Sequence, residues 1–311
     1  MITELAALLA GLLFAGVGGE LFVRAAVGIA AWARMPAGVI GATVAAFATS
    51  SPEVSVAIGA AAEGRPEIAL GDGLGSNVVN IALVLGLTLL VGPIAAPRES
   101  TRRDVPFAVL IPLITIVLAL DGLLSRLDAG ILVAVFFSWL VLTTVAARRE
   151  RSAAVDVLAE HSHGRSIVEM LFGLAFLVAA GRLIVYGAKG VGAELRLDTF
   201  IIGATLVAIG TSTPELATTL IARVRGHSEI GLGTVVGSNI YNGAFIIALA
   251  AFIHPITFTV REVGVTIGFG VALVLLLLNA RGTLGRRLGL LFLAIYASYV
   301  IVLVTLGPPS H

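Results

Sequence analysis

The 311-residue sequence contains no cysteine, few aromatic residues and few charges. The absence of cysteine excludes disulfides, thiolate metal sites and catalysis by a thiol. Charged residues make up 13% of the chain and aromatic residues 6%, whereas hydrophobic residues reach 58% and the mean hydropathy is +1.04. A soluble domain of this length has too little interior to bury so much apolar surface. The composition therefore predicts a protein that lies in lipid.

Ten apolar runs of about 18 residues or more divide the chain, and each is long enough to cross a hydrocarbon core about 30 Å thick. Helices are expected because the strands of a membrane barrel would alternate polar and apolar residues. The first run is too long for a signal peptide and lacks a basic segment before it, so we expect it to be retained. The predicted spans are 4–30, 38–62, 68–92, 105–122, 129–147, 166–193, 200–222, 230–253, 259–279 and 286–306.

Basic residues in the connections between these runs gather on one side of the predicted membrane. The positive-inside rule makes this side cytoplasmic and places both termini outside. The residues assigned to the cytoplasmic side are Arg34, Arg98, Arg102, Arg103, Arg148, Arg149, Arg151, Arg165, Arg223, Arg225, Arg281, Arg286 and Arg287. Those assigned to the outer side are Arg65, Arg126, Arg196 and Arg261.

The chain contains an internal repeat. Residues 41–94 align without a gap on residues 203–256, at a constant offset of 162 and with 22 identities. The best-matched segments are GATVAAFATSSPE with GATLVAIGTSTPE, and EIALGDGLGSNVVN with EIGLGTVVGSNIYN. A match of this extent indicates a duplicated structural unit. Their glycines predict close helix packing rather than a phosphate loop.

Each half holds five predicted helices, and this odd number makes the second half enter the membrane from the opposite side. We therefore predict an all-α polytopic membrane protein with ten transmembrane helices in two inverted five-helix repeats. The first repeat is 1–147, a cytoplasmic linker covers 148–165, and the second repeat is 166–311.

Each repeat places a proline and a glutamate in the middle of an apolar run, at Pro52–Glu53 and Pro214–Glu215. A carboxylate at the centre of a spanning helix costs about 2.5–3.5 kcal/mol on insertion scales and usually faces a partner, a cavity or an ion. Proline removes a helical hydrogen bond and frees a carbonyl, here that of Ala48 or Gly210. Helices two and seven are therefore expected to be broken, and a broken helix beside a carboxylate is typical of cation sites in transporters.

The polar side chains around these glutamates supply oxygen. Thr49 precedes Glu53 by four residues and Thr211 precedes Glu215 by four, a spacing that predicts one shared helix face in each repeat. Such oxygens suit calcium and alkali ions, whereas zinc or copper sites call for His or Cys. One such glutamate alone could be the structural partner of an arginine, but the constellation occurs twice. Further oxygen donors stand at matching positions in the two repeats: Ser50, Ser76, Asn80, Ser212, Ser238 and Asn242.

These motifs resemble the α-repeats of the cation/calcium exchanger superfamily, and most of all its sodium/calcium exchanger branch of prokaryotic type. The matching pairs are ATSSPE with GSNVVN and GTSTPE with GSNIYN. The resemblance implies that Glu53 and Glu215 share a calcium ion, with the backbones of Thr49 and Thr211 completing its shell. It also implies sodium sites formed by the carbonyls of Ala46 and Ala208, the hydroxyls of Thr49, Ser50, Ser76, Thr211, Ser212 and Ser238, and the amides of Asn80 and Asn242. The sequence departs from the family pattern at Ala48, Asp72 and Asn242, and Asp72 either attracts cations at the mouth of the site or binds one.

The sequence thus predicts a secondary-active antiporter, not an enzyme, that exchanges calcium for sodium by alternating access at a midplane site. An empty site leaves two buried like charges, so only states loaded with one calcium or two monovalent ions should cross readily. The expected partners are calcium, sodium and the lipid of a prokaryotic inner (plasma) membrane, without nucleic acid and without a cofactor. A proton/calcium or potassium-dependent antiporter remains the alternative. A cation channel is less favoured, because ion filters usually come from several subunits around a pore.

Overall fold

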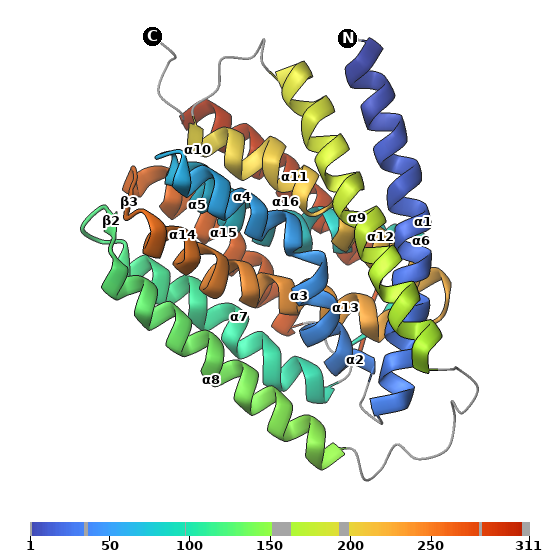
Figure 1. The fold of residues 1–311 in the computed structure, drawn as a ribbon. Coiled ribbons are helices and arrows are strands. Elements are labelled where there is room, and N and C mark those ends of the chain that lie inside the picture. The colour runs from blue at the N-terminus through green and yellow to red at the C-terminus, as the bar shows by residue number, and fades with distance from the viewer. Residues whose placement is uncertain are drawn as a thin grey trace.

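The computed structural model describes residues 2–33, 37–96, 98–150, 163–192, 199–279 and 282–306, which form long helices with short connections (Figure 1). Of the predicted linker 148–165, residues 151–162 lie outside the described residues. Among the described residues, four helical segments have the wider π-helical hydrogen bonding and are labelled η.

The elements of the first half are α1 (Ile2–Ala33), α2 (Ala37–Ile40), η1 (Gly41–Ala45), α3 (Ala46–Thr49), α4 (Ser51–Ala62), α5 (Pro66–Val78), η2 (Val79–Leu85), α6 (Gly86–Val91), β1 (Ile94–Ala96), α7 (Arg98–Leu118), β2 (Leu123–Leu124) and α8 (Arg126–Glu150). Those of the second half are α9 (His163–Gly192), α10 (Thr199–Ile202), η4 (Gly203–Val207), α11 (Ala208–Thr211), α12 (Thr213–Val224), α13 (Ser228–Ile240), η5 (Tyr241–Ile246), α14 (Ile247–Ile253), β3 (Ile256–Thr257), α15 (Val260–Asn279), β4 (Gly282–Leu284) and α16 (Arg286–Leu306).

Among the described residues, six helices are long and apolar enough to cross a membrane, and two bent pairs raise the number to eight when each pair is one span. The six are Leu9–Ile29, Pro66–Val91, Arg126–Ala146, Ser228–Ile253, Val260–Leu278 and Arg286–Thr305. Two shorter apolar helical stretches accompany them, Asp104–Leu118 and Ser166–Ala180. The protein is therefore a largely helical integral membrane protein, as its composition predicts.

The two bent pairs are the helices that the prolines are expected to break. Ala37–Thr49 meets Ser51–Ala62 at 41°, and Phe200–Thr211 meets Thr213–Val224 at 40°. The backbone leaves the helical conformation at the single residue between the two parts, with φ −79° and ψ 13° at Ser50. Each proline lies in the first turn of the restarted helix, where its missing N–H interrupts no hydrogen bond of that helix. The breaks in the predicted spans 38–62 and 200–222 are confirmed.

The carbonyl that Pro52 leaves without its helical donor has another partner. The hydroxyl of Ser51 donates to the carbonyl oxygen of Ala48 at 2.7 Å. At the second break the hydroxyl of Thr213 donates to the carbonyl of Ile209 at 3.2 Å, one residue before the carbonyl of Gly210 that Pro214 frees. The side chain that precedes each proline therefore donates to the backbone at the break, and at the first break it reaches the freed carbonyl itself.

The two halves pack against each other through matched glycine contacts. A Cβ added to Gly41 would lie 2.5 Å from the carbonyl oxygen of Ile230, and one added to Gly203 would lie 2.6 Å from that of Ile68. These contacts are counterparts, since Gly41 and Gly203, like Ile68 and Ile230, occupy equivalent positions of the two repeats. Such approach of one backbone to another requires glycine, so the packing predicted for the glycines of the repeats is confirmed.

The same reciprocity appears between α5 and α13. Gly75 on α5 lies against Ala204 of η4, and Gly237 on α13 lies against Ala42 of η1. A Cβ on Gly75 would be 2.5 Å from the carbonyl oxygen of Ala204. The helices that follow each broken pair are therefore locked against the broken pair of the other half.

Short strands join the halves again at the ends of the helices, a feature that the all-α prediction lacks. β1 pairs antiparallel with β4 through Ile94 and Leu284, and β2 pairs antiparallel with β3 through Leu123 and Thr257. Each two-stranded sheet takes one strand from each half. Strands of two or three residues are too short to show an alternating pattern in the sequence.

α1 and α9 lie side by side along one flank of the molecule (Figure 1). A Cβ on Gly18 of α1 would lie 2.9 Å from the carbonyl oxygen of Gly173 on α9, so small residues bring the two helices together. Glu20 ties α1 to the end of α12 by accepting a hydrogen bond from Arg225 Nε at 3.0 Å.

Candidate cation site

The predicted glutamates lie at the centre of the helical body and are fully buried. Glu53 and Glu215 each have 0% of their surface exposed. They occupy the first turns of α4 and α12, immediately after the breaks, where the helix dipole favours negative charge. The two carboxylates are close enough to interact electrostatically across the boundary between the halves. The arrangement therefore brings two acidic groups, one from each half, into one buried region.

Hydroxyl groups from both halves surround Glu215. Ser238 donates to Glu215 Oε1 at 3.0 Å, and Ser50 Oγ lies 3.2 Å from the same oxygen and 3.1 Å from Ser238 Oγ. The hydroxyl of Thr49 also faces this carboxylate. The second oxygen, Oε2, has no hydrogen-bond partner within the part of the chain that the structure describes. Glu215 thus has one oxygen held by protein donors and one oxygen open to another ligand.

Glu53 has a different environment. Among the described residues, neither of its carboxylate oxygens has a hydrogen-bond partner, and neither has the hydroxyl of Ser212. Thr211 faces Glu53, but its hydroxyl donates to Asp72 Oδ1 at 2.8 Å. Ser76 Oγ lies 3.3 Å from Thr211 Oγ1 and 3.4 Å from Asp72 Oδ1. A buried carboxylate without donors is unfavourable as an anion unless a proton or a cation neutralises it, so Glu53 is suited to binding a cation directly.

The pairing of threonines with glutamates differs from the pairing that the spacing predicts. Thr49 faces Glu215 and Thr211 faces Glu53, so each threonine meets the carboxylate of the other half. The cause is the break at Ser50 and Ser212. Because the helix bends between threonine and glutamate, the i to i+4 relation of a continuous helix does not hold there.

The carbonyls of the predicted backbone ligands accept the last helical hydrogen bond before each break. The carbonyl of Ala46 accepts the N–H of Ser50 at 3.0 Å, and that of Ala208 accepts the N–H of Ser212 at 3.0 Å. A carbonyl oxygen has two lone pairs, so each retains acceptor capacity for a cation.

The predicted amides lie one turn beyond the serines of α5 and α13. Asn80 donates to Asn239 Oδ1 at 3.1 Å, whereas neither side-chain polar atom of Asn242 has a partner among the described residues. The structure brings all twelve predicted site residues into the interior, and each is at most 1% exposed. They are Ala46, Thr49, Ser50, Glu53, Ser76, Asn80, Ala208, Thr211, Ser212, Glu215, Ser238 and Asn242.

The family model described as sodium/calcium exchanger protein matches residues 3–145 and 165–305. The chain belongs to the sodium/calcium exchanger family. The resemblance predicted from the paired motifs is therefore confirmed, and the family is one of transporters and not of enzymes.

Individual known proteins match almost the whole chain. The inner membrane protein YrbG of Escherichia coli is 29% identical, with 99% of each chain covered. The sodium/calcium exchanger MaX1 of Methanosarcina acetivorans is 28% identical and covers 95% of this chain and 97% of its own. A solved structure of the sodium-calcium exchanger NCX_Mj, soaked with 2.5 mM Na+ and 0.1 mM Ca2+, matches with a TM-score of 0.82 and 30% identity. That match covers 99% of this chain and 100% of the solved one.

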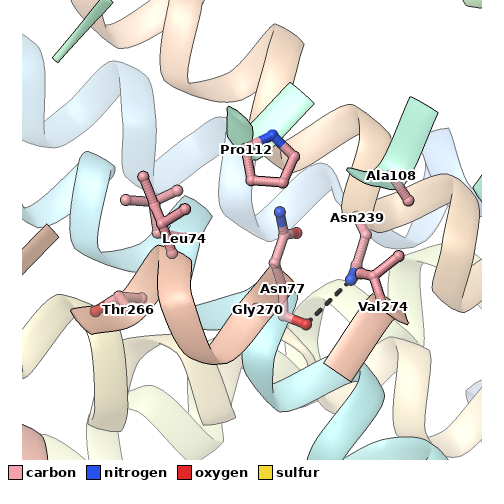
Figure 2. A pocket seen from close by; sticks show the side chains of 9 residues that line it. Leu74, Asn77, Ala108, Pro112, Asn239, Thr266, Gly270 and Val274 are labelled. Atoms are coloured by element: carbon pink, nitrogen blue, oxygen red, sulfur yellow. Dashed lines mark hydrogen bonds between the residues drawn. The ribbon is translucent and has the colours of Figure 1, made fainter. Parts of the chain in front are cut away.

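A pair of asparagines outside the predicted site residues connects α5 and α13 in this exchanger-family protein. Asn239 on α13 donates to the backbone carbonyl of Asn77 on α5 at 3.0 Å, and it accepts the hydrogen bond from Asn80. Both side chains line a small pocket between α5, α7, α13 and α15 (Figure 2). The signal that could have identified them is that both repeats have asparagine at this position, Asn77 in the first and Asn239 in the second.

The ligands available to a cation in this exchanger-family site are mainly neutral oxygens. Within the described ranges, no three His, Cys, Asp or Glu side chains gather closely enough to hold one metal ion. Calcium takes about six to eight oxygen ligands, often including carbonyls and amides. A calcium ion between Glu53 and Glu215 would therefore complete its shell with the hydroxyl, amide and carbonyl oxygens described above.

Proposed function

We propose that this protein is a secondary-active antiporter that exchanges calcium for sodium at the buried site between Glu53 and Glu215. The observation that carries the proposal is the pair of fully buried carboxylates, one from each half, with the carboxylate oxygens of Glu53 having no hydrogen-bond partner among the described residues. Two such charges without a cation are strongly unfavourable in a membrane. Binding one calcium, or two sodium ions, neutralises them.

This charge balance gives the reason for exchange. A site without cations carries two negative charges through the membrane, whereas a loaded site is neutral. Only loaded states therefore change sides readily, so each calcium that leaves must be replaced by sodium. Membership of the sodium/calcium exchanger family supports sodium as the counter-ion.

We propose alternating access by movement of α1 and α9 along the rest of the molecule. The support is that these two helices pack mainly on each other, with Gly18 and Gly173 at their contact, and lie outside both small sheets. The remaining helices hold the site through the matched contacts between the halves. A sliding pair on a fixed body would open the site to one side of the membrane at a time.

The proposed topology is ten spans in two inverted five-helix repeats, with both termini outside a prokaryotic inner membrane. It adds two spans, which contain Asp104–Leu118 and Ser166–Ala180, to the eight obtained when each bent pair is one span. The reciprocal contacts of Gly41 with Ile230 and Gly203 with Ile68 support a two-fold relation between the halves. The excess of basic residues on the predicted cytoplasmic side supports the placement of both termini outside.

Transport in reconstituted proteoliposomes tests the proposed function. Vesicles loaded with sodium and diluted into sodium-free medium with calcium-45 should accumulate calcium. Vesicles with a pH gradient or a potassium gradient in place of the sodium gradient should not. Calcium uptake that proceeds equally well with no counter-cation inside would contradict obligate exchange, and uptake driven by the pH or potassium gradient would assign the alternative coupling ion.

Calcium is also expected to stabilise the purified protein against heat. A ligand that binds the native state alone adds about 2.7 kcal/mol to the free energy of unfolding at 100 times its dissociation constant. Because the chain lacks cysteine, thiol-reactive dyes cannot report unfolding, and light scattering or size-exclusion chromatography after heating is the suitable measurement.

Magnesium at the same concentration serves as the control for this stabilisation. It should stabilise less, because it requires near-ideal octahedral geometry and loses its water reluctantly. An equal calcium effect in the double variant with Glu53→Gln and Glu215→Gln would locate the stabilising ion elsewhere.

A further inference from the structure

A third buried carboxylate lies beside the site and has no acidic counterpart in the other half. Asp72 on α5 is 0% exposed. The equivalent position of the second half holds Thr234. The hydroxyl of Thr234 donates to the carbonyl of Ile230 in its own helix at 2.9 Å. The charge of Asp72 is therefore a feature of one half only.

Asp72 changes the hydrogen bonds of the site on that side. In the second half, Ser238 donates to Glu215 at 3.0 Å. Its counterpart Ser76 lies within hydrogen-bond distance of Asp72 and Thr211, and Thr211 donates to Asp72 at 2.8 Å. The hydroxyls that could donate hydrogen bonds to Glu53 contact Asp72 instead.

Glu53 provides an independent sign that a ligand belongs on this side. It is fully buried, it faces Thr211, and its two oxygens have no hydrogen-bond partner within the described residues. The charges of Asp72 and Glu53 repel each other. Asp72 contacts the hydroxyls of Ser76 and Thr211, whereas Glu215 contacts those of Ser50 and Ser238. A cation at Asp72 would therefore be a different ion from the one that Glu53 shares with Glu215.

We propose that Asp72 is a third cation-binding carboxylate, which holds a monovalent cation together with the hydroxyls of Ser76 and Thr211. The proposal rests on the proposed exchange function and adds an acidic ligand to it. A single carboxylate with two hydroxyls balances one positive charge and offers the hard oxygens that alkali ions prefer. With three carboxylates, one calcium leaves one negative charge, and the ion at Asp72 neutralises it. The protein then binds one sodium ion more than its two glutamates alone would require.

Equilibrium binding of sodium-22 to the purified protein tests this proposal. The variant Asp72→Thr copies the residue of the other half, and Asp72→Asn keeps the side-chain shape without the charge. Since one carboxylate balances one monovalent charge, both variants should bind about one sodium ion fewer per chain than the wild type. Their Hill coefficient for sodium in calcium exchange should fall by about one. Both should still bind calcium, which checks that they fold.

Thr234→Val is the matched control, because it removes the hydroxyl at the equivalent position with little change of shape. It should leave the sodium count unchanged. Equal sodium counts in the wild type and both Asp72 variants would overturn the role of Asp72 while the exchange function stands. A wild-type protein that binds calcium but neither binds sodium nor exchanges it would overturn both proposals.

Discussion

Replacing Glu53 or Glu215 with glutamine is expected to lower sodium-driven calcium uptake at least a hundredfold. Each carboxylate supplies one of the two charges that neutralise the calcium ion, and removing one partner of a buried charge pair costs about 3–5 kcal/mol. At 1.36 kcal/mol for each factor of ten, the loss of ion binding exceeds two orders of magnitude. The measurement is the initial rate of calcium-45 uptake into proteoliposomes with equal amounts of each variant.

Folding of these variants should be preserved. In ion-free buffer each substitution removes one of two buried like charges, so neither variant should unfold at a lower temperature than the wild type. Glu63→Gln provides the matched control, since Glu63 ends the same helix as Glu53 but is exposed to solvent. It should transport at the wild-type rate. Calcium uptake at the wild-type rate in either site variant would show that the replaced glutamate is not a calcium ligand.

Replacing Gly75 with alanine is expected to destabilise the protein by about 3 kcal/mol or more, at the upper end of the usual cost of overpacking. The added Cβ would lie 2.5 Å from both the Cα and the carbonyl oxygen of Ala204. These are backbone atoms of η4 and cannot move aside as a flexible side chain would. The two halves must separate at this contact, which displaces Ser76 and Thr211 beside it. Both the melting temperature in detergent and calcium uptake should therefore fall.

Gly268→Ala separates this steric effect from the loss of a glycine. Gly268 lies in α15, and a Cβ there would meet no atom within 4 Å. Alanine favours an exposed helix over glycine by up to about 1 kcal/mol, so this variant should be as stable as the wild type or more so. A melting temperature for Gly75→Ala that equals that of Gly268→Ala would show that the close contact between the halves is dispensable.

The sequence was sufficient to predict the membrane class and the breaks. Hydrophobic runs reveal spanning helices because lipid excludes unpaired backbone groups, and Pro52 and Pro214 mark the breaks because proline cannot continue a helix. The helical ends were less predictable. α7 begins at Arg98, whereas the predicted span begins at 105, because a helix continues past the apolar stretch into charged residues.

The gathering of these oxygen-bearing residues in the interior was also predictable, because the repeat shows the same set twice. Which hydroxyl contacts which glutamate was not predictable. Thr49 reaches Glu215 only through the packing of the halves, and local spacing carries no information on contacts between residues so far apart in the chain. The hydrogen bonds of Asp72 with Ser76 and Thr211 depend on the same packing. The residue itself could be singled out because its counterpart is Thr234.

The matched glycine contacts between the halves have a thermodynamic consequence for transport. Because Gly41 on Ile230 and Gly203 on Ile68 form the same contact twice, the backbone contacts that flank the site are alike on its two sides, whereas the charge of Asp72 is on one side only. The inward-open and outward-open loaded states should then differ in free energy mainly through Asp72. As in any secondary-active carrier, the ion gradients and the membrane potential together decide which way calcium moves.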